Sequence, residues 1–198
     1  MDKNEAAIQQ ILKTNKGFVT ATQVTQAGIP RRCLSAMVEA GMINRAARGI
    51  YTQPEVWEDE MFFMQYRFSK GIYSHETALY LHGMTDRTPI RYTMTFPFGY
   101  NTGTVRKQGI AAKLCPVEIY DLGMITASSP NDNQVKVYDI ERTLCDIVKV
   151  RHRADIQVIN QAMKTYASSK NKDIAKLMNY ADRLRVKPKV LKYMEVLL

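Results

Sequence analysis

The feature that most restricts the fold is a succession of three short helical patterns near the N-terminus. Apolar residues recur at helical spacing over residues 3–14. Thr20 or Thr22 can cap a second, short helix. Pro30 suits the first turn of a third helix, where its missing N–H group is no loss, and Gly41 ends that helix. Three short helices therefore occupy the first 41 residues.

Two short strand patterns follow the third helix. Residues 42–45 and 49–52 are predicted to pair across a turn over residues 46–48. Three helices followed by a two-stranded ribbon is the order of a winged helix-turn-helix. We therefore expect such a domain over residues 1–56 and a separate C-terminal domain over residues 57–198.

Arginines surround the third helix and the ribbon. On a helical wheel, Leu34 and Met37 mark the apolar side, so Arg32 and Ser35 point away from it. Arg31 lies on the flank, at the N-terminal end of the helix. The N-terminal residues of a recognition helix contact base edges in the DNA major groove, and arginine binds guanine with two hydrogen bonds.

The ribbon and the second helix complete a predicted DNA-binding surface. Arginines on a wing reach phosphates or the minor groove, and the helix before a recognition helix crosses the DNA backbone. The alternative is a solvated basic face on a domain that binds proteins only. The residues expected to contact DNA are Lys16, Thr20, Thr22, Gln23, Arg31, Arg32, Ser35, Arg45 and Arg48.

The net charge of +9 favours a polyanionic partner, and the charge is unevenly distributed. Residues 1–55 hold seven Lys/Arg against four Asp/Glu, residues 56–148 hold nine against eleven, and residues 149–198 hold twelve against four. No apolar run is long enough to span a bilayer, and the N-terminus lacks the pattern of a signal peptide. We expect a cytoplasmic protein.

The rest of the sequence mixes helix and strand patterns. Helices are expected over residues 56–66 and 75–82, and from Ile140, where Asp139 is a predicted cap. Strands are expected over residues 91–98, and the chain after Asp155 is helical to its end. Shorter strands are expected at 117–120 and 134–138. The fold class is therefore α+β: a winged helix-turn-helix, then a mixed α/β domain that ends in helices.

No motif of an enzyme or metal site stands out. His75 and His82 lie two helical turns apart, about 10 Å, which is too far for one metal ion. Arg142 and Asp146, spaced i and i+4, are expected to form a structural ion pair. The GIY at residues 71–73 is not followed by YIG, and no nucleotide-binding or hydrolase motif is present. We expect no catalytic residues, metal or cofactor.

The last third of the chain is rich in cations. Two interpretations stay open: a solvated basic surface, or a patch that binds nucleic acid, in which tyrosines stack on bases. The residues of this possible basic patch are Arg151, Arg153, Lys170, Lys172, Lys176, Arg183, Arg185, Lys187, Lys189 and Lys192.

Three segments together resemble AbiEi-family antitoxins, which belong to bacterial abortive-infection toxin–antitoxin systems classed as type IV. They are the stretch from Thr22 to Tyr51, with GIPRRCLSAMVEAGMINRAARGIY, then SHETALYLHGMTDRTP and YDIERTLCDIVK. The resemblance implies that the winged helix represses its own operon by binding inverted repeats in the promoter. It also implies that the C-terminal domain counters a nucleotidyltransferase-like toxin without a stable complex.

The function expected from the sequence is therefore that of an antitoxin and transcriptional autorepressor in phage defence, not an enzyme. Its partners are double-stranded promoter DNA, the toxin as a functional partner and possible RNA, with no membrane. One alternative is a winged-helix module that neutralises a toxin by direct binding. Another is a nucleic-acid-processing enzyme with its active site in the second domain.

Overall fold

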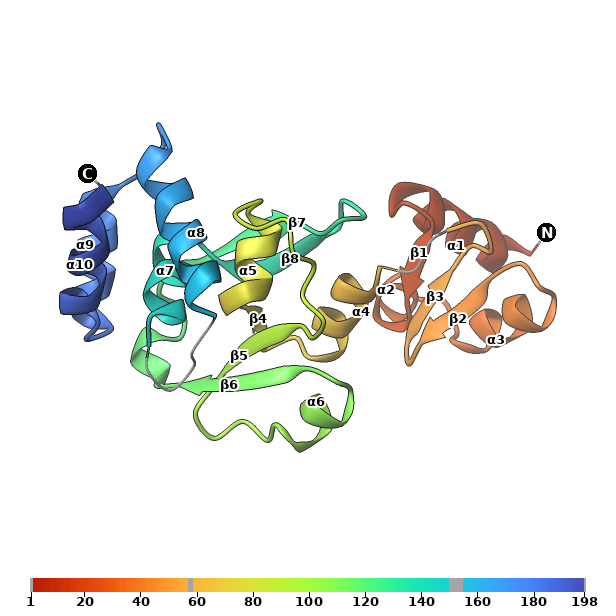
Figure 1. Ribbon diagram of the computed structural model, residues 1–198. Coiled ribbons are helices and arrows are strands. Elements are labelled where there is room, and N and C mark those ends of the chain that lie inside the picture. Colours follow the sequence, from red (N-terminus) through yellow and green to blue (C-terminus); the bar gives the residue numbers. More distant parts are fainter. Residues whose placement is uncertain (1, 57–58, 150–154, 198) are drawn as a thin grey trace. The chain divides into compact units, whose positions relative to one another are not determined.

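The computed structural model describes residues 2–56, 59–149 and 155–197 of the chain (Figure 1). The contacts between Cα atoms divide it into two units, Met1–Arg67 and Phe68–Leu198, which we call unit 1 and unit 2. Both units contain helices and a β-sheet, so the predicted mixture of α and β structure is confirmed. None of the described helices is both long and apolar enough to cross a membrane.

Unit 1 alternates helices with short strands. The strands form an antiparallel sheet in the order β1-β3-β2. Polar side chains fix the start of α1 and α2, because Asp2 with Glu5 and Thr20 with Gln23 form capping boxes. The elements are α1 (Lys3–Thr14), β1 (Phe18–Thr20), α2 (Ala21–Gln26), α3 (Arg32–Glu39), β2 (Asn44–Ala47), β3 (Ile50–Thr52) and α4 (Glu60–Arg67).

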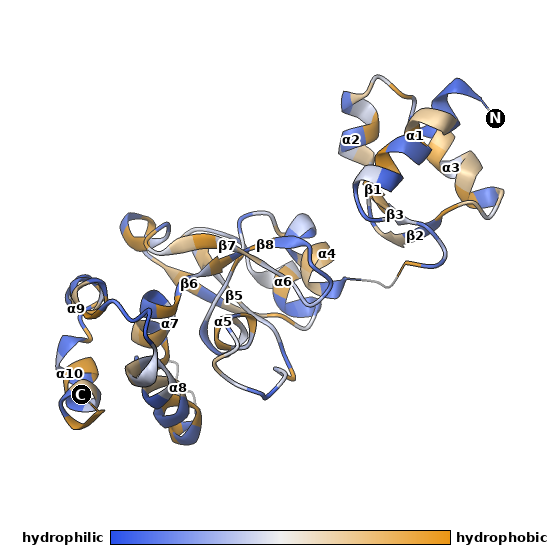
Figure 2. Ribbon diagram, turned by 90° about the horizontal axis from the view of Figure 1, so that it is seen from above, coloured by the Kyte–Doolittle hydropathy of each residue, from blue (hydrophilic) through white to orange (hydrophobic). Residues whose placement is uncertain are grey.

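The core of unit 1 collects one face from each of its first three helices. Figure 2 shows hydrophobic and hydrophilic residues along both α1 and α3, as expected of helices with one face in a core. The sheet adds apolar side chains from β1 and from the start of the ribbon. The buried core residues are Ile8, Leu12, Val19, Val24, Ile29, Leu34, Met37 and Ile43.

The ribbon lies two residues later than the sequence pattern predicts on its first strand. Ala47 pairs with Ile50, so the turn is the two residues Arg48 and Gly49, with Gly49 at φ +81°. The register shifts between Asn44 and Ala47. The three-residue strand β1 was not predicted, because so short a segment has no readable alternation.

Helix α4 belongs to unit 1, although the sequence pattern assigns it to the C-terminal domain. The sequence predicts this helix over residues 56–66, and residues 57 and 58 lie outside the described chain. In the structure the helix begins at Glu60. Phe62 packs on Phe18 with 4.6 Å between ring centroids. The hydroxyl groups of Thr22 and Tyr66 are 3.0 Å apart. These contacts join α4 to β1 and α2.

Unit 2 is built on a mixed five-stranded sheet in the order β6-β5-β4-β8-β7. The pairs β5–β6 and β4–β8 are parallel, and the pairs β4–β5 and β7–β8 are antiparallel. Its elements are β4 (Ile72–Tyr73), α5 (His75–Leu81), β5 (Thr93–Pro97), α6 (Gly103–Lys107), β6 (Ala111–Cys115), the 3-10 helix η1 (Val117–Ile119), β7 (Met124–Ser128), β8 (Gln134–Tyr138), α7 (Ile140–Ile147), α8 (Ile156–Ser168), α9 (Ile174–Arg183) and α10 (Lys187–Leu197).

The prediction of a strand at residues 117–120 is wrong. Pro116 precedes this segment and the chain turns into η1, where the N–H of Ile119 bonds to the carbonyl of Pro116. The Tyr120 hydroxyl then donates to the backbone carbonyl of Lys70. Tertiary contacts therefore decide this segment against its strand-like composition. Strands β4, β6 and β7 were also not predicted.

The C-terminal helices pack on one apolar core with α5 and α7. Figure 1 shows α9 and α10 side by side at the end of the chain, and α10 also contacts α8. Aspartates begin three of these helices: the carboxylates of Asp139, Asp155 and Asp173 accept hydrogen bonds from backbone N–H groups of α7, α8 and α9. The cap that the sequence predicts at Asp139 is thus confirmed.

A buried ion pair lies at the centre of unit 2. Arg142 is 1% exposed, and its Nε donates to Asp146 Oδ2 over 2.9 Å, which confirms the predicted pair. Its Nη1 donates to the carbonyls of Ile119 at 2.6 Å and Leu122 at 3.2 Å. The guanidinium also lies over the ring of Tyr138, 4.4 Å from the centroid.

The charge of Asp146 is held by its cationic neighbours. Burial alone would raise the pKa of this carboxyl group, but Arg142 and Lys149 outweigh that effect and hold the pKa below its usual value. Lys149 Nζ is 2.8 Å from Asp146 Oδ1. The carboxylate is therefore ionised in the folded protein at neutral pH.

Replacing Gly17 with alanine should destabilise unit 1. Gly17 has φ +85°, and a Cβ there would lie 2.3 Å from Val56 Cγ2. The left-handed conformation costs about 1–2 kcal/mol and the clash about 1–3 kcal/mol more. Urea unfolding measures the loss. Gly28→Ala is the matched control, because Gly28 has φ +73° and nothing within 4 Å of an added Cβ. Equal losses at the two positions would contradict the packing argument.

Replacing Asp146 with asparagine should remove about 3–5 kcal/mol of stability near neutral pH, because Arg142 would keep a buried, unpaired charge. The folded-state pKa of Asp146 is lowered, so its contribution is present above the unfolded value of about 3.9 and is lost as the pH falls through the folded value. The variant and the parent should therefore converge in acid.

Urea unfolding at about pH 7 and about pH 3 tests this convergence. Asp182→Asn is the control, because the Asp182 side chain is 72% exposed and its ion pair with Lys187 is long, at 3.8 Å. A constant difference between Asp146→Asn and the parent at both pH values would show that the ionised pair is not the source of the stability.

Candidate nucleic-acid interface

Helix α3 presents a narrow polar face to solvent. Leu34 and Met37 are fully buried, and they fix the rotation of the helix in the core. Arg32 and Ser35 are consequently exposed, as expected from the helical wheel. Among the described residues, no side chain or backbone group bonds to the guanidinium group of Arg32. This cation, at the N-terminal end of α3, is available to a ligand.

Arg31 is exposed but held in place. It occupies the cap position of α3, and its Nε donates to Thr25 Oγ1 over 2.9 Å. Thr25 comes from the last part of α2, so this bond ties the two helices across their turn. Thr25 was not among the residues predicted to matter, because nothing in its sequence position indicates a contact six residues away.

The ribbon carries two further exposed arginines. Arg45 lies on β2 and Arg48 in the turn before β3. The N–H of Ala21 donates to the carbonyl of Gly49 over 2.8 Å, which ties the turn to the start of α2. The position of the turn, and with it Arg48, is thus fixed by a backbone bond to α2.

The residues predicted around α2 divide into two groups. Thr20 is 4% exposed, and its hydroxyl accepts from the Gln23 N–H at 3.2 Å while the Thr20 N–H donates to Gln23 Oε1 at 2.9 Å. Thr20 therefore offers no free side chain to DNA, and Gln23 is half-buried in the same cap. Lys16 and Thr22 are exposed, although Thr22 contacts Tyr66.

The basic residues of the last third do not form one free patch. Lys172 Nζ donates to the Ser169 carbonyl at 3.3 Å and Lys189 Nζ to the Val148 carbonyl at 3.3 Å. Lys187 lies 3.8 Å from Asp182. Arg151 and Arg153 lie outside the described residues. The exposed members whose side chains have no hydrogen-bond or ion-pair partner among the described residues are Lys170, Arg183, Arg185 and Lys192.

Lys176 is a structural cation. Its Nζ lies 2.9 Å from Asp139 Oδ2 and 3.1 Å from Glu141 Oε2, so it joins α9 to the first turn of α7. Partial burial would lower its pKa, but hydrogen bonds to the two carboxylates outweigh this and raise it. Glu141 also accepts a hydrogen bond from the Tyr166 hydroxyl at 3.1 Å. The assignment of Lys176 to a nucleic-acid patch is therefore corrected.

The histidines of α5 are each placed by a hydrogen bond. His82 Nε2 lies 2.7 Å from the carbonyl of Tyr138, and His75 Nδ1 lies 3.0 Å from Ser74 Oγ. The two rings thus have different partners, one a side chain and the other a backbone carbonyl.

Comparison with known proteins identifies a relationship in unit 1. Residues 7–52 match the family described as "Transcriptional regulator, AbiEi antitoxin". No curated protein sequence gives a match. The crystal structure of the RV2827C protein from Mycobacterium tuberculosis is similar over 98% of this chain and 82% of that chain, with a TM-score of 0.58 and 12% sequence identity. At this identity the likeness concerns the fold alone.

Replacing Lys176 with alanine should destabilise unit 2, because Asp139 and Glu141 would remain buried without their shared cation. The Lys176 side chain is 36% exposed, so we expect a loss of about 1–3 kcal/mol rather than the full cost of breaking a buried pair. Lys170→Ala is the matched control, with an expected change below about 0.5 kcal/mol. Thermal or urea unfolding measures both, and equal small effects would exclude the structural role.

Proposed function

We propose that this chain is an antitoxin-type regulator that binds double-stranded DNA through unit 1, because residues 7–52 match the family described as "Transcriptional regulator, AbiEi antitoxin". The observation that carries the proposal is the exposed guanidinium of Arg32, which has no partner among the described residues. Arg32 is the first residue of α3, and the N-terminal end of a recognition helix is where base edges of the major groove are contacted.

The other elements of unit 1 support a winged helix-turn-helix assignment. In this proposal α2 and α3 are the helix-turn-helix pair, which the bond between Arg31 and Thr25 holds together. The β2–β3 ribbon is the wing, with Arg45 and Arg48 positioned for phosphates or the minor groove. Lys16, Thr22 and Ser35 are the further exposed residues of the interface.

The finer parts of the function rest on the family resemblance. We propose that unit 1 binds inverted repeats in the promoter of its own operon and represses it. Unit 2 then counters a nucleotidyltransferase-like toxin without a stable complex, as part of an abortive-infection response to phage. The separation of the chain into two units is compatible with this division of labour.

A gel-shift titration with the full-length protein tests DNA binding. The probe is the duplex upstream of the gene, compared with a scrambled duplex at two salt concentrations. The double variant Arg32→Ala, Arg48→Ala should bind the upstream duplex at least about tenfold more weakly, because each lost base contact costs about 1–3 kcal/mol. The slope of the logarithm of the binding constant against the logarithm of the salt concentration should become less steep by about one unit for each phosphate contact that is lost.

Lys13→Ala is the control variant, because Lys13 is an exposed cation on α1 that the interface does not include. Its affinity for the upstream duplex should equal that of the parent. Equal, weak binding of the parent to both duplexes would contradict sequence-specific recognition. A protein-binding role for the winged helix would then be the better interpretation.

Toxin neutralisation is tested separately in cells that express the neighbouring toxin gene. The double arginine variant should still protect these cells, because the proposal assigns protection to unit 2. Loss of protection by a folded variant would contradict the division between the two units. Retained protection together with lost DNA binding would support it.

A further inference from the structure

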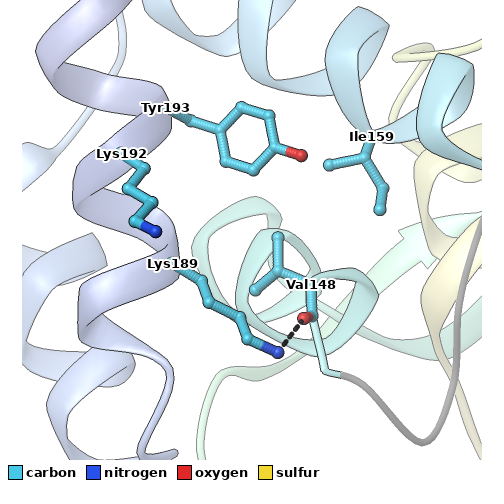
Figure 3. Close-up of a pocket in the computed structure, with 5 residues that line it drawn as sticks. All are labelled: Val148, Ile159, Lys189, Lys192 and Tyr193. Carbon is cyan, nitrogen blue, oxygen red and sulfur yellow. Dashed lines mark hydrogen bonds between the residues drawn. The ribbon is translucent and has the colours of Figure 1, made fainter.

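Two adjoining pockets lie along α10 in unit 2. The first, of about 290 Å³, is lined by Val148, Ile159, Lys189, Lys192 and Tyr193 (Figure 3). The second, of about 310 Å³, is lined by Asn160, Lys164, Lys192, Tyr193, Val196 and Leu197. They share the lining residues Lys192 and Tyr193, and we call the two pockets together the α8–α10 groove.

The floor of the groove is apolar. Figure 3 shows the Tyr193 ring reaching from α10 across the pocket toward Ile159 on α8. At the other end, Val196 lines the second pocket and is 82% exposed. Ile159 is itself buried in the core of unit 2, so the apolar surface left for a partner is that of Tyr193, Val196 and Leu197.

The rim of the groove is cationic. Lys189 is used within the fold, since it donates to the Val148 carbonyl at the end of α7. Lys164 and Lys192 are exposed, and the described part of the chain places no carboxylate within ion-pair distance of either. Within the described chain, no acidic residue lines either pocket, and this includes Glu195 of α10. The groove therefore complements an anionic partner.

The lining favours a protein segment over nucleic acid. Nucleic-acid interfaces are more polar than protein interfaces, and single strands bind on successive aromatic side chains. Among the described lining residues, Tyr193 is the one aromatic side chain, the other apolar ones are aliphatic, and Asn160 is a neutral polar neighbour. An aliphatic floor with a lysine rim instead matches the recognition of an amphipathic helix by a hydrophobic groove.

The length of the groove sets the size of the occupant. Its α10 wall runs from Lys189 to Leu197. At 1.5 Å per residue this is about 12 Å, or roughly two helical turns. We propose that the α8–α10 groove binds an acidic, amphipathic helical segment of a partner protein, with its apolar face on Tyr193 and Val196 and its carboxylates beside Lys164 and Lys192. This proposal does not depend on DNA binding by unit 1.

Fluorescence anisotropy with the full-length protein tests the proposal. The probe is a labelled peptide of about three turns, with leucine and phenylalanine at positions i, i+3, i+4 and i+7 and glutamate on its other faces. The comparison probes are a scrambled peptide of the same composition, the same peptide with lysine in place of glutamate, and a labelled single-stranded oligonucleotide. The amphipathic acidic peptide should bind most tightly, and its affinity should fall as salt rises.

Variants locate the binding site. Lys192→Glu and Lys164→Glu should each weaken binding of the acidic peptide at least tenfold, and Val196→Asp should do so as well. Lys170→Glu makes the same charge change on an exposed residue outside the groove, and it should leave the affinity unchanged. Circular dichroism confirms that each surface variant is folded.

Three outcomes would overturn the proposal. The first is that the amphipathic and scrambled peptides bind with equal affinity, or that neither of them binds. The second is an equal effect of Lys192→Glu and Lys170→Glu, which would indicate attraction by the net charge alone. The third is tighter binding of the oligonucleotide, lost in Lys192→Glu, which would assign the groove to nucleic acid. None of these outcomes would alter the result of the promoter gel shift, so the two proposals fail independently.

Discussion

The architecture of unit 2 depends on one buried guanidinium group. A cation removed from water must have its donors bonded, because an unpaired buried charge costs several kcal/mol. Arg142 meets this requirement with Asp146 on its own helix and with the carbonyls of Ile119 and Leu122. These bonds fix the loop between β6 and β7 against α7. A Cβ on Gly123 would lie 2.8 Å from the Cβ of Arg142, so the loop also needs glycine at this point.

A second group of charges attaches the C-terminal helices to that centre. Asp139 caps α7 and accepts from Lys176 of α9, while Glu141 binds both Lys176 and Tyr166 of α8. One turn of α7 thus organises two of the helices that follow it. Lys164 and Lys192, by contrast, have no carboxylate partner among the described residues. This difference separates the cations that hold unit 2 together from the two that stay exposed at the rim of the α8–α10 groove.

Unit 1 is stabilised in a different way from unit 2, by hydrogen bonds between residues that are close in sequence. Its turns rest on local polar bonds, namely the capping box of Thr20 and Gln23 and the bond from Arg31 to Thr25. At Gly17, the missing side chain leaves room for the close approach of Val56. The polar bonds occupy several polar side chains near the proposed DNA surface. Arg31, Arg32, Arg45 and Arg48 nevertheless all stay exposed, and the bond to Thr25 holds Arg31 in position.

The sequence by itself determined the local features whose cause is local. Helical periodicity and caps located α3, α5 and α7, and i, i+4 spacing identified the pair of Arg142 and Asp146. Tertiary structure decided what depends on distant partners. Strands β1 and β4, of three and two residues, are too short to show a pattern, and β6 and β7, of five residues each, show no regular alternation of apolar and polar residues, so pairing decided all four. Packing on Phe18 placed α4 in unit 1, and the buried carboxylates of α7 made Lys176 structural. The composition gives the number of charged residues, but the tertiary structure determines which of them are exposed to solvent.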